Sequence, residues 1–197
     1  MNQRGFNLVE LISTLAILAC LLGIGAPPLL RSSGDLRLHL AAEEMAAVLR
    51  LARIYAARHS ANVAVKFRTA QDGAVTYTLY RDGDGDGVLN RDIDAGVDPQ
   101  VAPPQRLTQL GRGFGFGFPP GPAPRDPGSP QRRLDDLDDP IRFNDSDLAS
   151  FSPLGTATSG SLYLTDGVKR LAAVRVFNRT GKVRVLTYDS EKEVWRE

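Results

Sequence analysis

The sequence has few of the side chains that most enzymes use for catalysis. It contains one cysteine, Cys20, and two histidines, His39 and His59. A single cysteine excludes a disulfide framework and a cysteine-based zinc site, and two histidines leave little room for histidine-dependent chemistry. The sequence also shows no pairing of a nucleophile with a base and no phosphate-binding loop. We therefore expect that the protein is not an enzyme.

The chain also lacks an excess of charge of either sign. Its 24 lysines and arginines nearly balance 23 aspartates and glutamates, for a net charge of +1. A balanced charge creates no overall field that would attract nucleic acid or anionic lipid, so any such binding has to come from a local patch. The length of 197 residues suits one globular domain with an additional anchoring segment.

Charge is absent from a long segment near the N-terminus. Leu11–Leu30 contains twenty residues without a charge, and a helix of that length would span about 30 Å, the thickness of a hydrocarbon core. A buried core helix would show a polar stripe, whereas this segment has only Ser13 and Thr14. A secretory signal peptide would be shorter and would end in a small-residue cleavage site. The sequence therefore predicts a transmembrane helix over residues 6–30.

The residues before this segment form a specific pattern, Arg4-Gly5-Phe6-Asn7-Leu8-Val9-Glu10. A carboxylate inside a membrane helix costs about 2.5–3.5 kcal/mol, so Glu10 needs a partner or a role. A solvated glutamate at a helix end is the simpler alternative. Gly-Phe-x-Leu-x-Glu at the start of a hydrophobic helix closely resembles the type III signal of type IV prepilins.

This resemblance implies a maturation pathway. A prepilin peptidase would cut between Gly5 and Phe6, remove the leader 1–5 and leave a methylated Phe6. Glu10 would then meet the N-terminal amine of a neighbouring subunit. The resemblance also implies a single-pass protein of the bacterial inner membrane with its C-terminal head in the periplasm. The implied partners are the prepilin peptidase, other pilins or pseudopilins of the filament, and the inner membrane.

The pattern predicts an amphipathic helical segment over residues 31–60, with a break at Gly34 and Asp35 as the N-cap of the helix that follows the break. Its apolar face would carry Leu38, Ala42, Met45, Leu49, Ala52 and Ala56. Alternating apolar residues then predict antiparallel strands, first at 63–67 and 75–79 and later at 162–164, 172–176 and 183–187. The expected fold class is α+β, in which a long N-terminal helix (transmembrane half plus amphipathic half) packs on an antiparallel β-sheet head over 61–197.

A long insertion at about 95–140 interrupts the expected head. Its segment Gly111–Pro130 is so rich in glycine and proline that we predict no ordered core element there. One interpretation is a flexible surface loop. The other is that Phe114, Phe116 and Phe118 form contacts for a partner subunit.

Three further segments resemble the GspH/FimT group of minor pilins and pseudopilins. The first is 49–58 together with the Val-x-Val strand at 63–65. The second consists of the two neighbouring stretches 151–155 and 159–164. The third is Gly181-Lys182-Val183-Arg184-Val185. The resemblance implies a structural subunit that initiates or caps a type II secretion pseudopilus or a type IV pilus. The alternative is a filament-tip module that captures DNA through Lys182 and Arg184. The same charges could instead protect an exposed sheet edge from aggregation.

An acidic segment between residues 82 and 90 resembles the first part of an EF-hand calcium loop. Oxygen-bearing side chains recur at alternate positions, and the candidate ligands are Asp82, Asp84, Asp86, the carbonyl of Val88, Asn90, Asp92 and Asp94. The expected carboxylate at position twelve is replaced by Ile93, and Asp98 is a further candidate. The sequence therefore offers two alternatives, a Ca2+ site or a solvated acidic hairpin.

Overall fold

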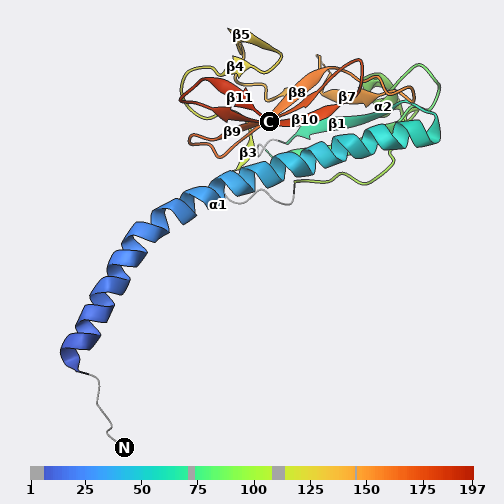
Figure 1. Cartoon of the computed structure of the whole chain (residues 1–197). Helices are drawn as coiled ribbons and strands as arrows, with labels where there is room; N and C mark the ends of the chain where they lie inside the picture. Colours follow the sequence, from blue (N-terminus) through green and yellow to red (C-terminus); the bar gives the residue numbers. More distant parts are fainter. Residues whose placement is uncertain (1–6, 71–73, 108–113, 145) are drawn as a thin grey trace, which may run out of the picture. The chain divides into compact units, whose positions relative to one another are not determined.

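A computed structural model describes residues 7–70, 74–107, 114–144 and 146–197, without the side chains of 22–32. The chain divides into two compact units, Met1–Leu36 and Arg37–Glu197, which are described separately here. Helix α1 (Leu8–His59) begins in the first unit and ends in the second. The second unit also contains helix α2 (Asn90–Ala95) and every described strand (Figure 1).

Local hydrogen bonds define both ends of helix α1. The carbonyl oxygen of Asn7 accepts from the backbone N–H groups of Glu10 (3.0 Å) and Leu11 (3.1 Å), as expected for a helix-capping residue. At the other end, Ser60 has a φ of 50°, and the Ala61 N–H donates to the Ala56 carbonyl at 3.3 Å. A left-handed residue directly after the last turn is a common way for a helix to end.

Within the second unit, α1 buries one face. Six residues spaced three or four apart are at most 2 % exposed: Leu38, Ala42, Met45, Leu49, Ala52 and Ala56. This is the apolar face that the sequence predicts, and it is confirmed. Because three of the six are alanines, the helix backbone can approach the strands closely.

The first sheet contains β1 (Val63–Thr69), β2 (Val75–Arg81) and β7 (Leu148–Phe151), in the order β2-β1-β7. Its pairings are antiparallel, with Val63 opposite Arg81 and Thr69 opposite Val75 in the β1–β2 pair. Both faces of this sheet are covered. Val63, Val65 and Phe67 belong to the main core with α1, whereas Ala64 belongs to a smaller cluster with Tyr80, Val88 and Leu148.

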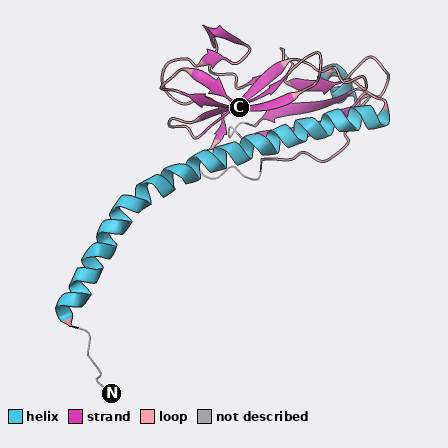
Figure 2. Cartoon of the chain, viewed as in Figure 1, coloured by secondary structure: helices cyan, strands magenta, loops and turns pink. Residues whose placement is uncertain are grey.

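The second sheet is larger and is also antiparallel. Its order is β11-β10-β9-β8-β3, and β6 also pairs with β8. Figure 2 shows the strands of the second unit in magenta. The strands are β3 (Gly115–Phe116), β6 (Ile141–Arg142), β8 (Gly160–Thr165), β9 (Leu171–Val176), β10 (Val183–Asp189) and β11 (Val194–Arg196). Leu162, Leu164 and Val174 contribute to the main core, and Tyr163 and Ala173 contribute to a separate cluster.

The separate cluster includes Phe118, Leu134 and Leu137 from the insertion, which corrects the prediction for Gly111–Pro130. Strands β4 (Arg125–Asp126) and β5 (Ser129–Arg133) form a hairpin. The ring of Phe118 lies 4.8 Å from that of Tyr163, and the Trp195 Nε1–H donates to the Arg125 carbonyl at 2.6 Å. The described residues of this segment from 114 onward therefore have a defined structure. Contacts between aromatic side chains stabilise it despite the high content of glycine and proline. Residues 111–113 lie outside the described part.

Phe114 and Phe116, which we considered as partner contacts, pack instead against the main core. Phe118 belongs to the cluster with Leu134, Tyr163 and Leu171. The three phenylalanines therefore attach the insertion to the fold.

The predicted transmembrane half is wrong. Within the described residues, no helix combines the length and the apolar character needed to cross a membrane. The expected fold class, which included a transmembrane half, and the expected single-pass location in the inner membrane are both corrected by this finding.

The predicted break at Gly34 is also wrong. Helix α1 continues from Leu8 to His59, so Asp35 lies inside it and does not act as an N-cap. A glycine costs a helix only about 1 kcal/mol relative to alanine. That penalty does not interrupt a helix whose following turns bury several apolar side chains.

The buried face of α1 leads to a stability prediction. Leu49 is fully buried and Leu51 is 60 % exposed on the same helix. We expect Leu49→Ala to lower the free energy of unfolding by about 2–5 kcal/mol, because it removes core contacts and leaves a cavity. The matched variant Leu51→Ala should change it by no more than about 0.5 kcal/mol. Urea denaturation of the full chain measures both, and equal losses would show that this face of α1 is not the core.

Candidate functional site

The acidic loop, defined as residues 82–90, connects β2 to α2. It begins at Asp82, which is 9 % exposed, and continues through the exposed residues Asp84 and Asp86. Gly85 and Gly87 have φ angles of 95° and 102°. Glycine adopts such angles without steric cost, so the loop can turn sharply and bring alternate side chains to one side.

Asp82 organises this turn through its carboxylate. It accepts hydrogen bonds from the backbone N–H groups of Asp84 (3.2 Å), Gly85 (2.7 Å) and Gly87 (3.0 Å), and from Asn62 Nδ2 at 2.8 Å. Burial raises the pKa of Asp82, but these donors outweigh that effect and hold the pKa below its ordinary value. The ionised carboxylate therefore stabilises the loop conformation at neutral pH.

Asp98 closes the acidic loop from outside. This residue is 1 % exposed, and its Oδ1 accepts from the Gly83 N–H while its Oδ2 accepts from the Leu89 N–H, both at 3.0 Å. One carboxylate thus joins the two ends of the loop. From the sequence we considered Asp98 only as a further metal ligand and missed this role, because no local pattern reveals a contact between residues fifteen positions apart.

The three aspartates of the loop come together as the sequence predicts. Asp82, Asp84 and Asp86 can each place a carboxylate oxygen within 4.8 Å of the others. Desolvation raises the pKa of Asp86, and the hydrogen bond and charge of Asp84 and the charge of Asp92 raise it further. The Arg91 guanidinium partly offsets this charge, since it lies 2.7 Å from Asp86 and 3.2 Å from Asp92.

The other predicted ligands are placed differently. The Asn90 side chain donates to the Ser146 carbonyl at 3.3 Å, and Asp94 lies 3.6 Å from Arg68. The Val88 side chain is buried, and Ile93 at position twelve packs against the same cluster. Asp92 lies near Asp86, since both pair with Arg91. The structure therefore brings Asp82, Asp84 and Asp86 together with Asp92 nearby, and it directs Asn90 and Asp94 elsewhere.

This donor set suits a hard cation in part. Calcium takes about 6–8 oxygen ligands, and the three clustered aspartates, with Asp92, supply carboxylate oxygens of the right kind. The position-twelve carboxylate is missing, and Arg91 would have to move away from Asp86. That movement is inexpensive, because the Arg91 side chain is 71 % exposed. The calcium site stays a prediction.

The processing and assembly residues lie at the start of the chain. Gly5 and Phe6 fall outside the described residues. Glu10 is exposed in the first turn of α1, where a carboxylate interacts favourably with the positive end of the helix dipole.

The predicted nucleic-acid residues lie at the start of β10. Lys182 is exposed immediately before this strand. Arg184 lies 3.2 Å from Glu197 and 5.6 Å above the Phe177 ring. A guanidinium that already has an acidic partner and a ring contact is less available to phosphate.

Comparison with known proteins provides no match. No family model, no curated protein and no solved structure matches this chain. The resemblance to GspH/FimT pilins therefore depends on the sequence motifs alone.

The acidic loop generates a metal-binding prediction. We expect millimolar calcium to raise the melting temperature of the full chain, because a ligand that binds only the folded state stabilises it. Asp84→Asn should remove this gain, since Asp84 belongs to the cluster but makes fewer structural bonds than Asp82. Arg91→Gln should strengthen binding by removing a competing cation.

Asp136→Asn, outside the loop, is the matched control. Calorimetry without calcium heat and an unchanged melting temperature would refute the site.

The ion pair of Arg184 generates a prediction about DNA. We expect the full chain to bind duplex DNA weakly or not at all at about 150 mM salt, because binding through phosphates loses its strength as salt rises. Fluorescence anisotropy measures this. Micromolar affinity that disappears in a Lys182→Ala/Arg184→Ala variant, but not in an Arg58→Ala variant, would contradict the prediction.

Proposed function

We propose that this chain is a structural subunit of a pilin-like filament, a minor pilin or pseudopilin that initiates or caps the assembly. The observation that supports the proposal is the surface of α1 in the first unit. Its large apolar side chains are between 48 % and 70 % exposed: Leu8, Val9, Leu11, Ile12, Leu15, Ile17, Leu18 and Leu21.

These side chains surround the helix. Successive residues in a helix are separated by about 100°, so this set leaves no polar stripe. The hydroxyl groups of Ser13 and Thr14 donate to the carbonyls of Val9 and Leu11, which satisfies the two hydroxyl donors within the helix itself. An exposed apolar surface of this extent is typical of an interaction site. Each large aliphatic side chain that a partner buries would contribute about 1.5–3 kcal/mol.

Helices of neighbouring subunits are the partners we propose for this surface. Glu10 is the only charged side chain among the described ones between residues 7 and 21. If neighbouring helices bury it, its carboxylate requires a cation. Cleavage between Gly5 and Phe6 would create such a cation, the free amine of Phe6 on an adjacent subunit. The motif and the apolar helix thus support the same role.

The cleavage site provides the direct test. We expect co-expression with a prepilin peptidase to shorten the chain by residues 1–5 and to leave a methylated Phe6, as measured by mass spectrometry of the intact protein. Gly5→Leu should block the cut, because a protease needs close access to the backbone at the scissile bond. Glu10→Gln should leave cleavage intact but prevent incorporation into filaments.

The matched control is Glu43→Gln on the same helix. Glu43 forms an exposed ion pair with Arg50 at 3.0 Å, so its loss should alter neither cleavage nor incorporation. Filaments that contain the chain with residues 1–5 still attached would contradict the proposal. So would equal incorporation of Glu10→Gln and the unaltered chain.

A further inference from the structure

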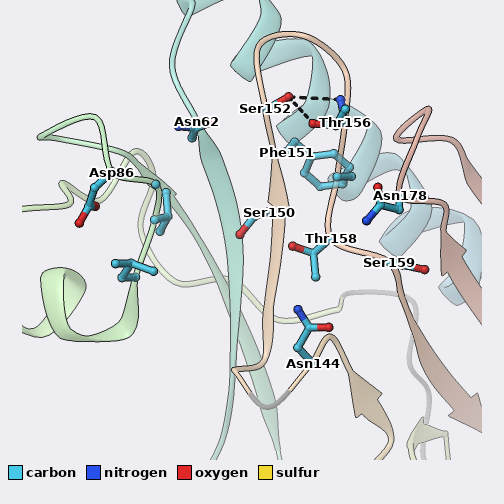
Figure 3. A pocket seen from close by; sticks show the side chains of 14 residues that line it. Asn62, Asp86, Asn144, Ser150, Phe151, Ser152, Thr156, Thr158, Ser159 and Asn178 are labelled. Atoms are coloured by element: carbon cyan, nitrogen blue, oxygen red, sulfur yellow. Dashed lines mark hydrogen bonds between the residues drawn. The ribbon is translucent and has the colours of Figure 1, made fainter.

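A cavity of about 530 Å3 lies beside β7. Its walls come from the end of the acidic loop, from β7 and the segment 152–159 that follows it, and from Asn144 and Asn178 (Figure 3). The volume falls within the range of about 300–1,000 Å3 that small-molecule sites occupy. All of these walls belong to the second unit.

The described lining is rich in uncharged polar side chains and almost without charge. Eight of the fourteen described lining residues are asparagine, serine or threonine, and the only ionisable one is Asp86. Since 24 % of the chain is charged, fourteen residues would be expected to carry about three charges. No described lining residue is a lysine or an arginine, so a phosphate or carboxylate ligand would find no cation there. The one carboxylate, on Asp86, already pairs with Arg91 at 2.7 Å.

Several of these polar groups are available to a ligand. Within the described part of the chain, the side chains of Asn144, Ser150, Thr158 and Asn178 make no hydrogen bond, and Figure 3 shows them around the same space. Ser152 and Thr156, by contrast, bond to each other at 2.7 Å. Amide and hydroxyl groups can both donate and accept hydrogen bonds. They therefore complement a ligand whose own groups do the same.

The walls of the cavity are held in place by backbone contacts. The Thr158 N–H donates to the Ser150 carbonyl, and the Ala157 N–H donates to the Asn178 carbonyl, both at 2.9 Å. Asn144 has a φ of 51°, in the left-handed region. The turn that contains it is fixed by Lys66 Nζ, which donates to the Ser146 carbonyl at 2.8 Å. A site that exists before the ligand arrives costs less to order on binding.

We propose that this cavity binds a neutral saccharide. The hydroxyl groups of a sugar donate and accept, as the lining does, and an uncharged sugar loses nothing from the absence of a cation. Phe151, the one aromatic side chain of the described lining, is 1 % exposed, so it offers no ring face for stacking. Of the aliphatic side chains, Val88 is 5 % exposed and Leu89 is half-buried. The affinity should therefore be weak, with a Kd on the order of 1 mM. The inference does not depend on the proposed filament role.

Saturation-transfer NMR on the full chain tests this proposal. The probes are glucose, galactose, N-acetylglucosamine and maltose at about 10 mM, roughly ten times the expected Kd. Glucose 6-phosphate and glucosamine serve as charged counterparts. We expect signals from at least one neutral sugar and weaker or absent signals from the charged ones.

Two isosteric variants locate the site. Thr158→Val removes a hydroxyl group without changing the shape of the side chain, and Asn144→Asp replaces an amide with a charge. Each should weaken binding at least fivefold. Thr187→Val, an exposed position on β10, is the matched control and should leave binding unchanged. Thermal melts show that each variant is folded.

The proposal is overturned by any of four results. The first two are the absence of signal from every neutral sugar and binding that survives both Thr158→Val and Asn144→Asp. The third is tighter binding of a charged sugar than of the neutral ones. The fourth is that a neutral peptide binds in preference to the sugars and that the same two variants abolish this binding.

Discussion

The arrangement of the second unit depends on one face of helix α1. The same core contains Met45 and Leu49 from the helix, Val65 and Phe67 from the first sheet, and Leu162 and Val174 from the second. The two sheets form separate hydrogen-bonded ladders, and the core that they share with the helix joins them. Burial of a shared apolar surface takes the place of continuous strand pairing. Between the two ladders, the segment 152–159 connects β7 to β8, and the cavity lies beside it.

The acidic loop shows how a folded chain accommodates clustered negative charge. Backbone N–H groups solvate Asp82, Asp98 accepts hydrogen bonds at both ends of the loop, and Arg91 lies beside Asp86. In each case, a hydrogen-bond donor or a cation of the chain itself replaces water around a carboxylate. As a result the loop has a defined conformation of its own, and a bound cation would add to that order without having to create it.

Sequence patterns predicted the features that depend on local periodicity. The apolar stripe of α1 from Leu38 to Ala56 and the alternation in β1, β8 and β9 follow directly from the geometry of helix and strand. The clustering of Asp82, Asp84 and Asp86 was likewise visible, because alternate residues of a tight turn share a side.

The features that depend on distant contacts were not predictable in this way. Composition suggested that the insertion around Phe118 would be flexible, but a partner ring on Tyr163 orders it. The role of Asp98 depends on backbone groups in a different segment. The interruption expected at Gly34 did not occur, because a local propensity of this size is easily outweighed. The cavity combines residues from 62 to 178, so no single motif could indicate it.

The contact between the insertion and the C-terminal strand ties together two parts of the chain that are far apart in sequence. Trp195 donates to the Arg125 carbonyl, Tyr188 accepts from the Arg125 N–H, and Glu193 pairs with Arg125 and Arg133. A chain without this insertion would leave the aromatic residues of β10 and β11 uncovered. In evolution the two segments should therefore lengthen, shorten or change together. For the experimenter, a tag fused after Glu197 would lie next to this packed end.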